Sequence, residues 1–208
     1  MLFVPLVIVS IMQPYFFPYR GYFRLIEESD IFVIYDCVQF PRRGWVHRNT
    51  PTHGGPWLTV PLSKCDLDTR IKDVLLSEDY EESMSNRINK FPQIVKSLEE
   101  NIPLRGALLH RKDRNLLSLL VDTLQLSCDF LGINFDYCFS SQLGINDEIK
   151  GENRIISISK EMGATEYINA PSGKSLYSDE NFNKEGIKLR FLEDWTGPLD
   201  SIITSIIE

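Results

Sequence analysis

Two polar segments of the chain combine aromatic, amide and charged side chains in a pattern suited to binding a nucleotide or a sugar. The first segment, residues 11–24, follows an apolar run and surrounds one glutamine with tyrosines and prolines. Tyrosine rings in such a loop stack on a base or a sugar, and a glutamine amide donates and accepts hydrogen bonds. The free N–H groups of a helix that starts here favour an anion. The candidate substrate-binding residues of this segment are Gln13, Tyr15, Tyr19 and Gly21.

The second segment, residues 36–49, adds groups that take part in acid–base chemistry and phosphate binding. Asp36 follows an apolar run, and a carboxylate at the end of a strand binds a sugar hydroxyl, holds a metal or acts as a base. His47 is the histidine best placed to be a general base, and Arg48 offers a two-pronged hydrogen-bond donor to phosphate or carboxylate. We predict that these three residues are catalytic. Further substrate-binding candidates are Arg43, Trp45 and Asn49.

Both segments also have a purely structural interpretation. The aromatic residues 15–17 would cap the core while the prolines stiffen the turn, and Asp36 would form a surface ion pair with a nearby arginine. A further candidate is Lys174, within a Ser-Gly-Lys-Ser stretch that lacks the spacing of a P-loop; the alternative there is a capped turn before a short helix.

The elements that must position these residues follow from hydrophobic patterning. Residues 4–11 are apolar and β-branched, which predicts a strand buried on both faces. The two prolines of residues 12–20 predict a loop, residues 21–29 a short helix, and the apolar run after Asp30 a second buried strand. This order is a βαβ unit, in which the loop lies at the carboxyl end of the first strand.

The remainder alternates between the two patterns. Glycines and prolines within residues 38–62 predict a β-hairpin excursion. Helices are predicted at residues 81–99, 112–131 and 150–162, and strands at 71–77, 134–140, 166–169 and 187–193. The predicted fold is α/β: a Rossmann-like three-layer, mostly parallel sheet with a hairpin after the second strand, forming a single domain over residues 1–208.

Composition limits the classes of partner. The chain has 208 residues, 43% of them hydrophobic, and a net charge of −7, so it is globular and repels nucleic acid. The four scattered cysteines include no CxxC pair, and no metal-binding motif occurs, so we predict no metal site. The N-terminal run lacks a basic flank and a cleavage site and is too short to span a membrane. We therefore expect a cytoplasmic protein with reduced thiols.

Several unusual blocks occur in an order that resembles the WbqC-like protein family. They include IMQPYFFPYRGYFRLI, FVIYDCVQF, RRGWVHRN and WLTVPL, then CDFLGI, KGENRIISISKEMGATEYINAPSGKSLY and EGIKLRFL. The resemblance covers nearly the whole chain and implies a role in bacterial O-antigen or capsule biosynthesis. The positions that it implies are Gln13, Pro14, Tyr15, Tyr19, Gly21, Asp36, Trp45, Arg48 and Asn49. The C-terminal DWTGPLDSIITSIIE departs from the pattern, so we expect one wall of the site to be altered or supplied by another subunit.

A more distant resemblance concerns nucleotidyltransferases with a His-x-Gly-His signature, which bind a nucleotide triphosphate on the loop after the first strand. Here the corresponding stretch is Pro18-Tyr19-Arg20-Gly21-Tyr22, without either histidine. Arg20 or Lys174 would have to stabilise the phosphoryl charge.

Three functions follow as hypotheses. The first is a transferase of surface-polysaccharide biosynthesis that acts on a nucleotide-activated sugar or its substituent. The second is a nucleotidyltransferase-like enzyme that activates a small acid or sugar phosphate. The third is a non-catalytic binding subunit of a glycan assembly complex. The expected partner is a small molecule, with a homo-oligomer or a complex with other glycan enzymes as further options, and the sequence identifies no cofactor.

Overall fold

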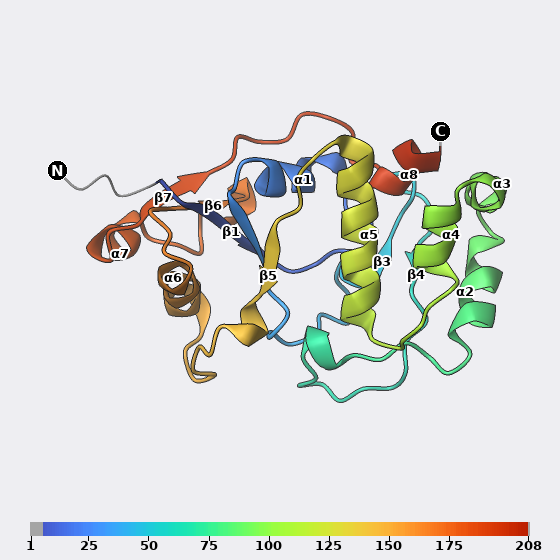
Figure 1. The fold of residues 1–208 in the computed structure, drawn as a ribbon, viewed down its shortest axis with the longest axis horizontal. Helices are drawn as coiled ribbons and strands as arrows, with labels where there is room; N and C mark the ends of the chain where they lie inside the picture. The colour runs from blue at the N-terminus through green and yellow to red at the C-terminus, as the bar shows by residue number, and fades with distance from the viewer. Residues whose placement is uncertain (1–5, 208) are drawn as a thin grey trace. The chain divides into compact units, whose positions relative to one another are not determined.

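The structure is a computed structural model that describes residues 6–207, and it divides into two compact units (Figure 1). The sheet unit contains the described residues 6–13 together with residues 21–35 and 134–197. The hairpin unit contains residues 14–20, 36–133 and 198 onward. Of the first predicted strand, residues 4 and 5 lie outside the described part. The prediction of a single domain stays a prediction.

The sheet unit is built on five strands in the order β5-β2-β1-β6-β7, and each described pairing is parallel. The strands are β1 Ile8–Met12, β2 Ile31–Ile34, β5 Tyr137–Phe139, β6 Glu166–Asn169 and β7 Lys188–Phe191. Counted along the chain, this is the doubly wound order 3-2-1-4-5, with the switch point between β1 and β6. The predicted α/β class and mostly parallel sheet are confirmed.

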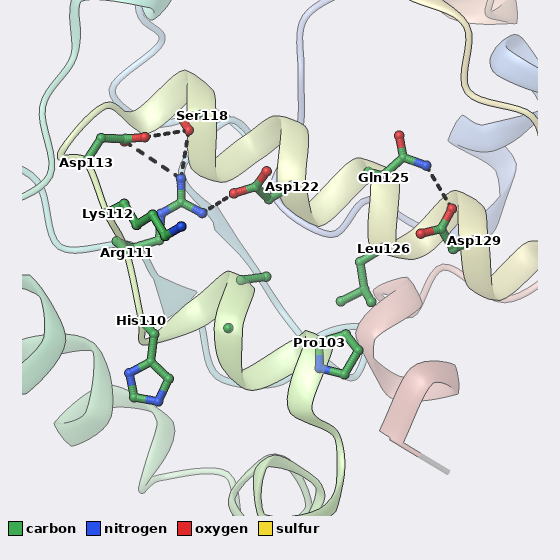
Figure 2. A pocket seen from close by; sticks show the side chains of 12 residues that line it. Pro103, His110, Arg111, Lys112, Asp113, Ser118, Asp122, Gln125, Leu126 and Asp129 are labelled. Atoms are coloured by element: carbon green, nitrogen blue, oxygen red, sulfur yellow. Dashed lines mark hydrogen bonds and ion pairs between the residues drawn. The ribbon is translucent and has the colours of Figure 1, made fainter.

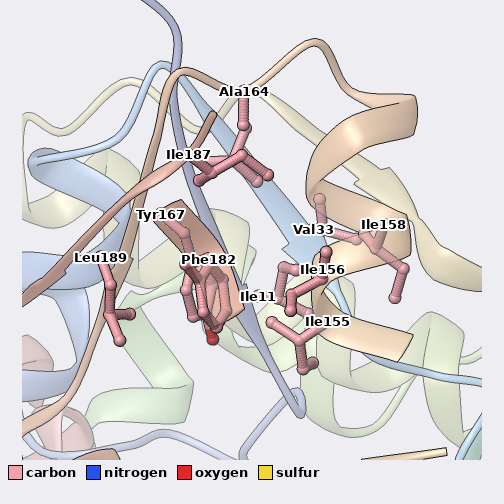
Figure 3. Close-up of a cluster of buried hydrophobic side chains, with 11 residues drawn as sticks. Ile11, Val33, Ile155, Ile156, Ile158, Ala164, Tyr167, Phe182, Ile187 and Leu189 are labelled. Atoms are coloured by element: carbon pink, nitrogen blue, oxygen red, sulfur yellow. The ribbon is translucent and has the colours of Figure 1, made fainter. Parts of the chain in front are cut away.

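Helices cover both faces of this sheet. Ile11 of β1 and Val33 of β2 pack in a buried cluster with the isoleucines of α6 and with Phe182 of α7 (Figure 3). On the other face, the hydroxyl of Ser10 donates a hydrogen bond of 2.9 Å to the carbonyl of Leu25 in α1. Because side chains alternate along a strand, neighbouring residues of β1 contact different helical layers. The helical elements of this unit are α1 Arg20–Glu27, α6 Gly151–Glu161, α7 Asp179–Lys184 and the 3₁₀ turns η2 Ser140–Gln142 and η3 Pro171–Gly173.

The hairpin unit combines a short antiparallel ribbon with helices. The ribbon pairs β3 Arg48–Asn49 with β4 Leu58–Thr59, which confirms the predicted hairpin excursion. The other elements are the 3₁₀ turn η1 Ile71–Asp73 and the helices α2 Tyr80–Ile88, α3 Pro92–Glu100, α4 Ile102–Leu108, α5 Leu116–Leu131 and α8 Ile202–Ile207.

Two predicted elements in this unit are wrong in detail. Residues 71–77 form η1 followed by isolated bridges at Leu75 and Leu76. Ile71, Val74 and Leu76 are buried, which explains the apolar pattern, but no neighbouring strand extends these single bridges into a sheet. The single helix predicted at 81–99 is two helices, since Pro92 lacks an N–H and instead begins α3. Within residues 6–207, no helix is long and apolar enough to cross a membrane.

Candidate functional site

An exposed cluster of aromatic rings and positive charge lies on the ribbon of the hairpin unit. Trp45 and Trp57 are each 44% exposed, and their ring centroids are 5.1 Å apart. The guanidinium carbon of Arg48 lies 4.3 Å from the centroid of the Trp57 ring, which is a cation–π contact. Large rings on the surface beside a cation form a suitable surface on which a base or sugar can stack. We call Trp45, Arg48 and Trp57 the tryptophan platform.

Arg48 uses only some of its hydrogen-bond donors within the protein. Its Nη2 donates a hydrogen bond of 2.8 Å to the carbonyl of Arg43, so Arg43 orients Arg48 through its main chain. The Nε of Arg48 is buried and has no hydrogen-bond partner among the described residues. No carboxylate of residues 6–207 forms an ion pair with Arg48, so its charge remains available to an anionic ligand.

His47 lies directly before β3 and is 9% exposed. Its main-chain carbonyl accepts a hydrogen bond of 2.7 Å from the N–H of Val60, and its ring packs edge-on against Phe40 at 5.1 Å. Burial, followed by the positive charges of Arg48 and Arg87, lowers the pKa of His47 to about 4. The imidazole is therefore neutral at pH 7, which suits a proton acceptor and not a proton donor.

The aromatic loop after β1 is held in place by residues of the second segment. The N–H of Phe16 donates 3.1 Å to the carbonyl of Trp45. The side-chain amide of Asn49 donates to the carbonyls of Phe16 and Phe17, at 3.2 and 2.7 Å. Phe17 has a positive φ of 42°, a backbone conformation that residues other than glycine rarely adopt. Asn49 therefore stabilises an uncommon backbone conformation, while a direct contact of its amide with substrate stays a prediction.

The two tyrosines of this loop lie close to each other. Tyr15 is partly buried, and its pKa is raised by burial and, to a smaller extent, by Tyr19. The main chain of Tyr19 forms an isolated antiparallel β-bridge with Ser201 in the C-terminal segment. The hydroxyl of Ser201 also donates a hydrogen bond of 2.6 Å to the carbonyl of Phe17. The departure of the C-terminus from the family pattern thus falls on a segment that supports the aromatic loop.

Asp36 is 1% exposed, deeper than a residue that meets substrate at the surface. Its main-chain carbonyl accepts a hydrogen bond of 3.1 Å from the N–H of Lys72. This hydrogen bond holds the segment after β2 against η1. Its predicted catalytic role stays a prediction.

The remaining predicted residues belong to the sheet unit. Gln13 follows β1, and its carbonyl accepts 2.9 Å from the hydroxyl of Tyr22 in α1. Gly21 is buried in the first turn of α1, and Lys174 is exposed directly after η3, beyond the carboxyl end of β6. Because β1 and β6 are neighbours, Gln13 and Lys174 follow adjacent strands at the switch point of the sheet.

Three residues near the site were missed by the sequence analysis: Trp57, Arg87 and Ser201. Trp57 stands at the start of an extended segment that the sequence predicts as one arm of a hairpin. The register observed in the structure is what brings this segment next to Arg48. Arg87 lies on α2, and its Nη1 donates 2.7 Å to the carbonyl of Thr59. Arg87 lies 40 positions from His47 in the sequence, which leaves no local signal for this arrangement.

A separate hollow of about 440 Å³ lies between α4 and α5 of the hairpin unit (Figure 2). Its buried charge is Arg111, which forms an ion pair with Asp122 and donates 2.8 Å to the hydroxyl of Ser118. None of the predicted site residues lines this hollow, and its buried arginine is already paired. Among the residues that the structure describes, no group of three or more His, Cys, Asp or Glu side chains is placed to hold a metal ion.

Comparison with known proteins gives one family and one relative of unassigned function. The model of the WbqC-like protein family matches residues 13–196. A protein described as "Uncharacterized protein Rv1507c" from Mycobacterium tuberculosis is 29% identical over 190 residues, which is 89% of this chain and 81% of that protein. No solved structure matches the chain significantly.

Proposed function

Since the chain belongs to the WbqC-like protein family, we propose that it is an enzyme of bacterial surface-polysaccharide biosynthesis, a transferase that acts on a nucleotide-activated sugar or its substituent. The association of the family with O-antigen and capsule gene clusters supports the pathway. The site supports the class of substrate. The reaction takes place in the cytoplasm, as the sequence predicts, on a small-molecule donor.

The tryptophan platform is the observation that carries the proposal. A nucleotide-linked sugar has a base and a sugar ring that stack on aromatic faces, joined by phosphates that need a cation. Trp45 and Trp57 offer the faces, and Arg48 offers the cation within 4.3 Å of one of them. Arginine suits this position because its flat guanidinium stacks on a ring and still donates in plane to phosphate.

The other residues of the hairpin unit take supporting roles. Tyr15 and Tyr19 extend the aromatic surface on a loop that Asn49 holds. His47, neutral at pH 7 because its pKa is about 4, accepts a proton. Asp36 orients or activates the acceptor. Within the sheet unit, Gln13 and Lys174 stay predicted substrate-binding residues at the switch point.

A thermal-shift screen tests the substrate class, with ATP, CTP, UDP-sugars and dTDP-sugars as ligands. A ligand at one hundred times its Kd stabilises the folded state by about 2.7 kcal/mol. We expect a nucleotide-sugar to raise the Tm and Trp57→Ala and Arg48→Gln to remove most of this rise. Arg114→Gln is the matched control, because Arg114 is an exposed arginine of the same unit. If no nucleotide-sugar raises the Tm, the proposed substrate class is wrong.

Turnover is tested separately with the donor that the screen finds. Asp36→Asn is expected to keep donor binding and lose transfer, and His47→Gln is expected to lose transfer. Full transfer by both variants would exclude their catalytic roles.

A second candidate, a non-catalytic binding subunit, is favoured by one observation. Asp36 and His47, two of the three predicted catalytic side chains, are only 1% and 9% exposed. This candidate predicts that a nucleotide-sugar binds without turnover and that the chain forms a stable complex with a glycan-assembly enzyme.

A further inference from the structure

The two arginines that act on His47 differ from three other arginines of the protein in that they form no ion pair with a described carboxylate. Arg111, Arg154 and Arg190 each form an ion pair with an aspartate or glutamate. Arg48 and Arg87 form none with any carboxylate of residues 6–207. The carboxylate of Asp79, just before α2, acts electrostatically on Arg87 without forming an ion pair with it. An anion that contacts both arginines would lower the cost of bringing the two cations together.

The hairpin register explains how these groups come together. Arg48 of β3 pairs with Thr59 of β4, and Arg87 of α2 donates 2.7 Å to the carbonyl of the same Thr59. His47 lies one residue before Arg48 and accepts a hydrogen bond from Val60, the residue after Thr59. Two elements, β3 and α2, thus present positive charge to one imidazole.

Unsatisfied nitrogen atoms at the same place point to a missing ligand. The Nδ1 of His47 and the Nε of Arg48 are both buried and have no hydrogen-bond partner among the described residues. The Nε atoms of Arg105, Arg111 and Arg154 are unpaired as well, so the imidazole nitrogen carries the argument. The His47 residue itself is 91% buried, as its exposed fraction is 9%. Buried polar atoms are nearly always paired, so an unpaired imidazole nitrogen under the influence of two cations indicates a group that arrives from outside.

We propose that His47, Arg48 and Arg87 form a binding site for a phosphate-class oxyanion and that His47 takes up a proton when the anion binds. This inference rests on the proposed function for the identity of the anion, which is the phosphate of a nucleotide-linked donor. Arg48 and Arg87 supply the charge. An oxyanion opposes the effect of the two arginines on the imidazole and gives its protonated nitrogen an acceptor.

Proton uptake makes the binding depend on pH. The ionisable groups that act on the imidazole are Arg48 from β3 and Arg87 from α2, and together with burial they keep the free imidazole neutral down to a pKa of about 4. If the bound state carries one more proton, affinity for the anion rises as the pH falls, by at most about tenfold per pH unit.

An NMR titration of the histidine side chains with sodium sulfate tests the proposal. Sulfate is the probe because it stays a dianion across the range used, so any pH dependence belongs to the protein. We expect saturating sulfate to raise the pKa of His47 and sulfate to bind severalfold more tightly at about pH 5 than at about pH 7. Arg87→Gln should raise the pKa of His47 without sulfate and weaken sulfate binding roughly tenfold. His53→Gln is the matched control, since His53 is an exposed histidine of the same unit.

The outcomes separate this inference from the proposed function. Sulfate that raises the pKa of His47 and competes with a UDP-sugar assigns the site to the donor's phosphate, whereas simultaneous binding assigns it to a free anion. Sulfate that leaves the pKa of His47 unchanged overturns the inference, even if a UDP-sugar still binds. Absence of UDP-sugar binding beside a clear sulfate effect overturns the proposed function alone. Arg87→Lys, which keeps the charge, provides the test if Arg87→Gln fails to fold.

Discussion

The buried, neutral imidazole of His47 predicts a specific loss of stability in acid. The pKa of His47 is about 4 in the folded state and about 6.5 in an unfolded chain. Between these values the unfolded state binds more protons, so the free energy of unfolding falls as the pH falls. Removing the side chain in His47→Gln removes this contribution, whatever the variant does to stability at neutral pH.

The size of the effect follows from the two pKa values. At pH 5 the full shift corresponds to about 2 kcal/mol of lost unfolding free energy relative to pH 7.5. Because the imidazole is not wholly shielded from solvent, screening reduces this to roughly 1 kcal/mol. The full effect, reached below the folded-state pKa, is at most about 3.4 kcal/mol.

Urea unfolding followed by circular dichroism at both pH values measures this difference. Wild-type protein is expected to lose roughly 1–2 kcal/mol more than His47→Gln between pH 7.5 and pH 5. His53→Gln, which changes an exposed histidine, should behave as the wild type does. Equal acid losses in wild type and His47→Gln would refute the buried, neutral state of this imidazole.

Three further substitutions test the packing that supports the site. Asn49→Ala should cost about 2 kcal/mol in urea unfolding, because the carbonyl of Phe16 loses its donor and that of Phe17, at a positive φ, keeps only the hydroxyl of Ser201. An effect below about 0.5 kcal/mol would contradict this role. Phe182→Ala should lower the free energy of unfolding by about 3–5 kcal/mol, since the ring is fully buried and stacks on Tyr167 of β6. Leu176→Ala, which changes an exposed residue, should leave the free energy of unfolding unchanged in the same measurement. Gly132→Ala should cost about 1 kcal/mol and lower the Tm, because Gly132 ends α5 with a φ of 68°; an unchanged Tm would show that this end is not strained.

Much of the sheet unit could be predicted because its sequence signals are local. The β-branched runs that form β1 and β2 and the proline-rich loop between β1 and α1 define a βαβ unit without any distant contact. The strand at Glu166–Asn169 is found at the predicted residues, since a Tyr-Ile pair follows a helix that ends before Gly163. These features depend on periodicity and on glycine and proline, which any single sequence displays.

The parts that could not be predicted depend on long-range pairing. Trp57 joins Trp45 and Arg48 only because β4 returns antiparallel to β3, and the turn between them does not fix this register in the sequence. Arg87 reaches the same place from α2, through a contact that no local pattern encodes. Burial of Asp36 is likewise a product of packing after β2, so the sequence indicated its chemistry and not its depth.

Quenching of tryptophan fluorescence by a nucleotide-linked sugar tests the tryptophan platform most directly. The chain has three tryptophans, so Trp195→Phe leaves emission from Trp45 and Trp57 alone. In this background we predict that a UDP- or dTDP-sugar quenches the emission saturably and that Trp57→Ala weakens the apparent affinity at least about tenfold, as expected for the loss of a stacked ring. The platform would be contradicted as the donor site by two results together. A nucleotide-sugar would bind tightly without changing the emission of Trp45 and Trp57, and Trp57→Ala would leave its affinity unchanged.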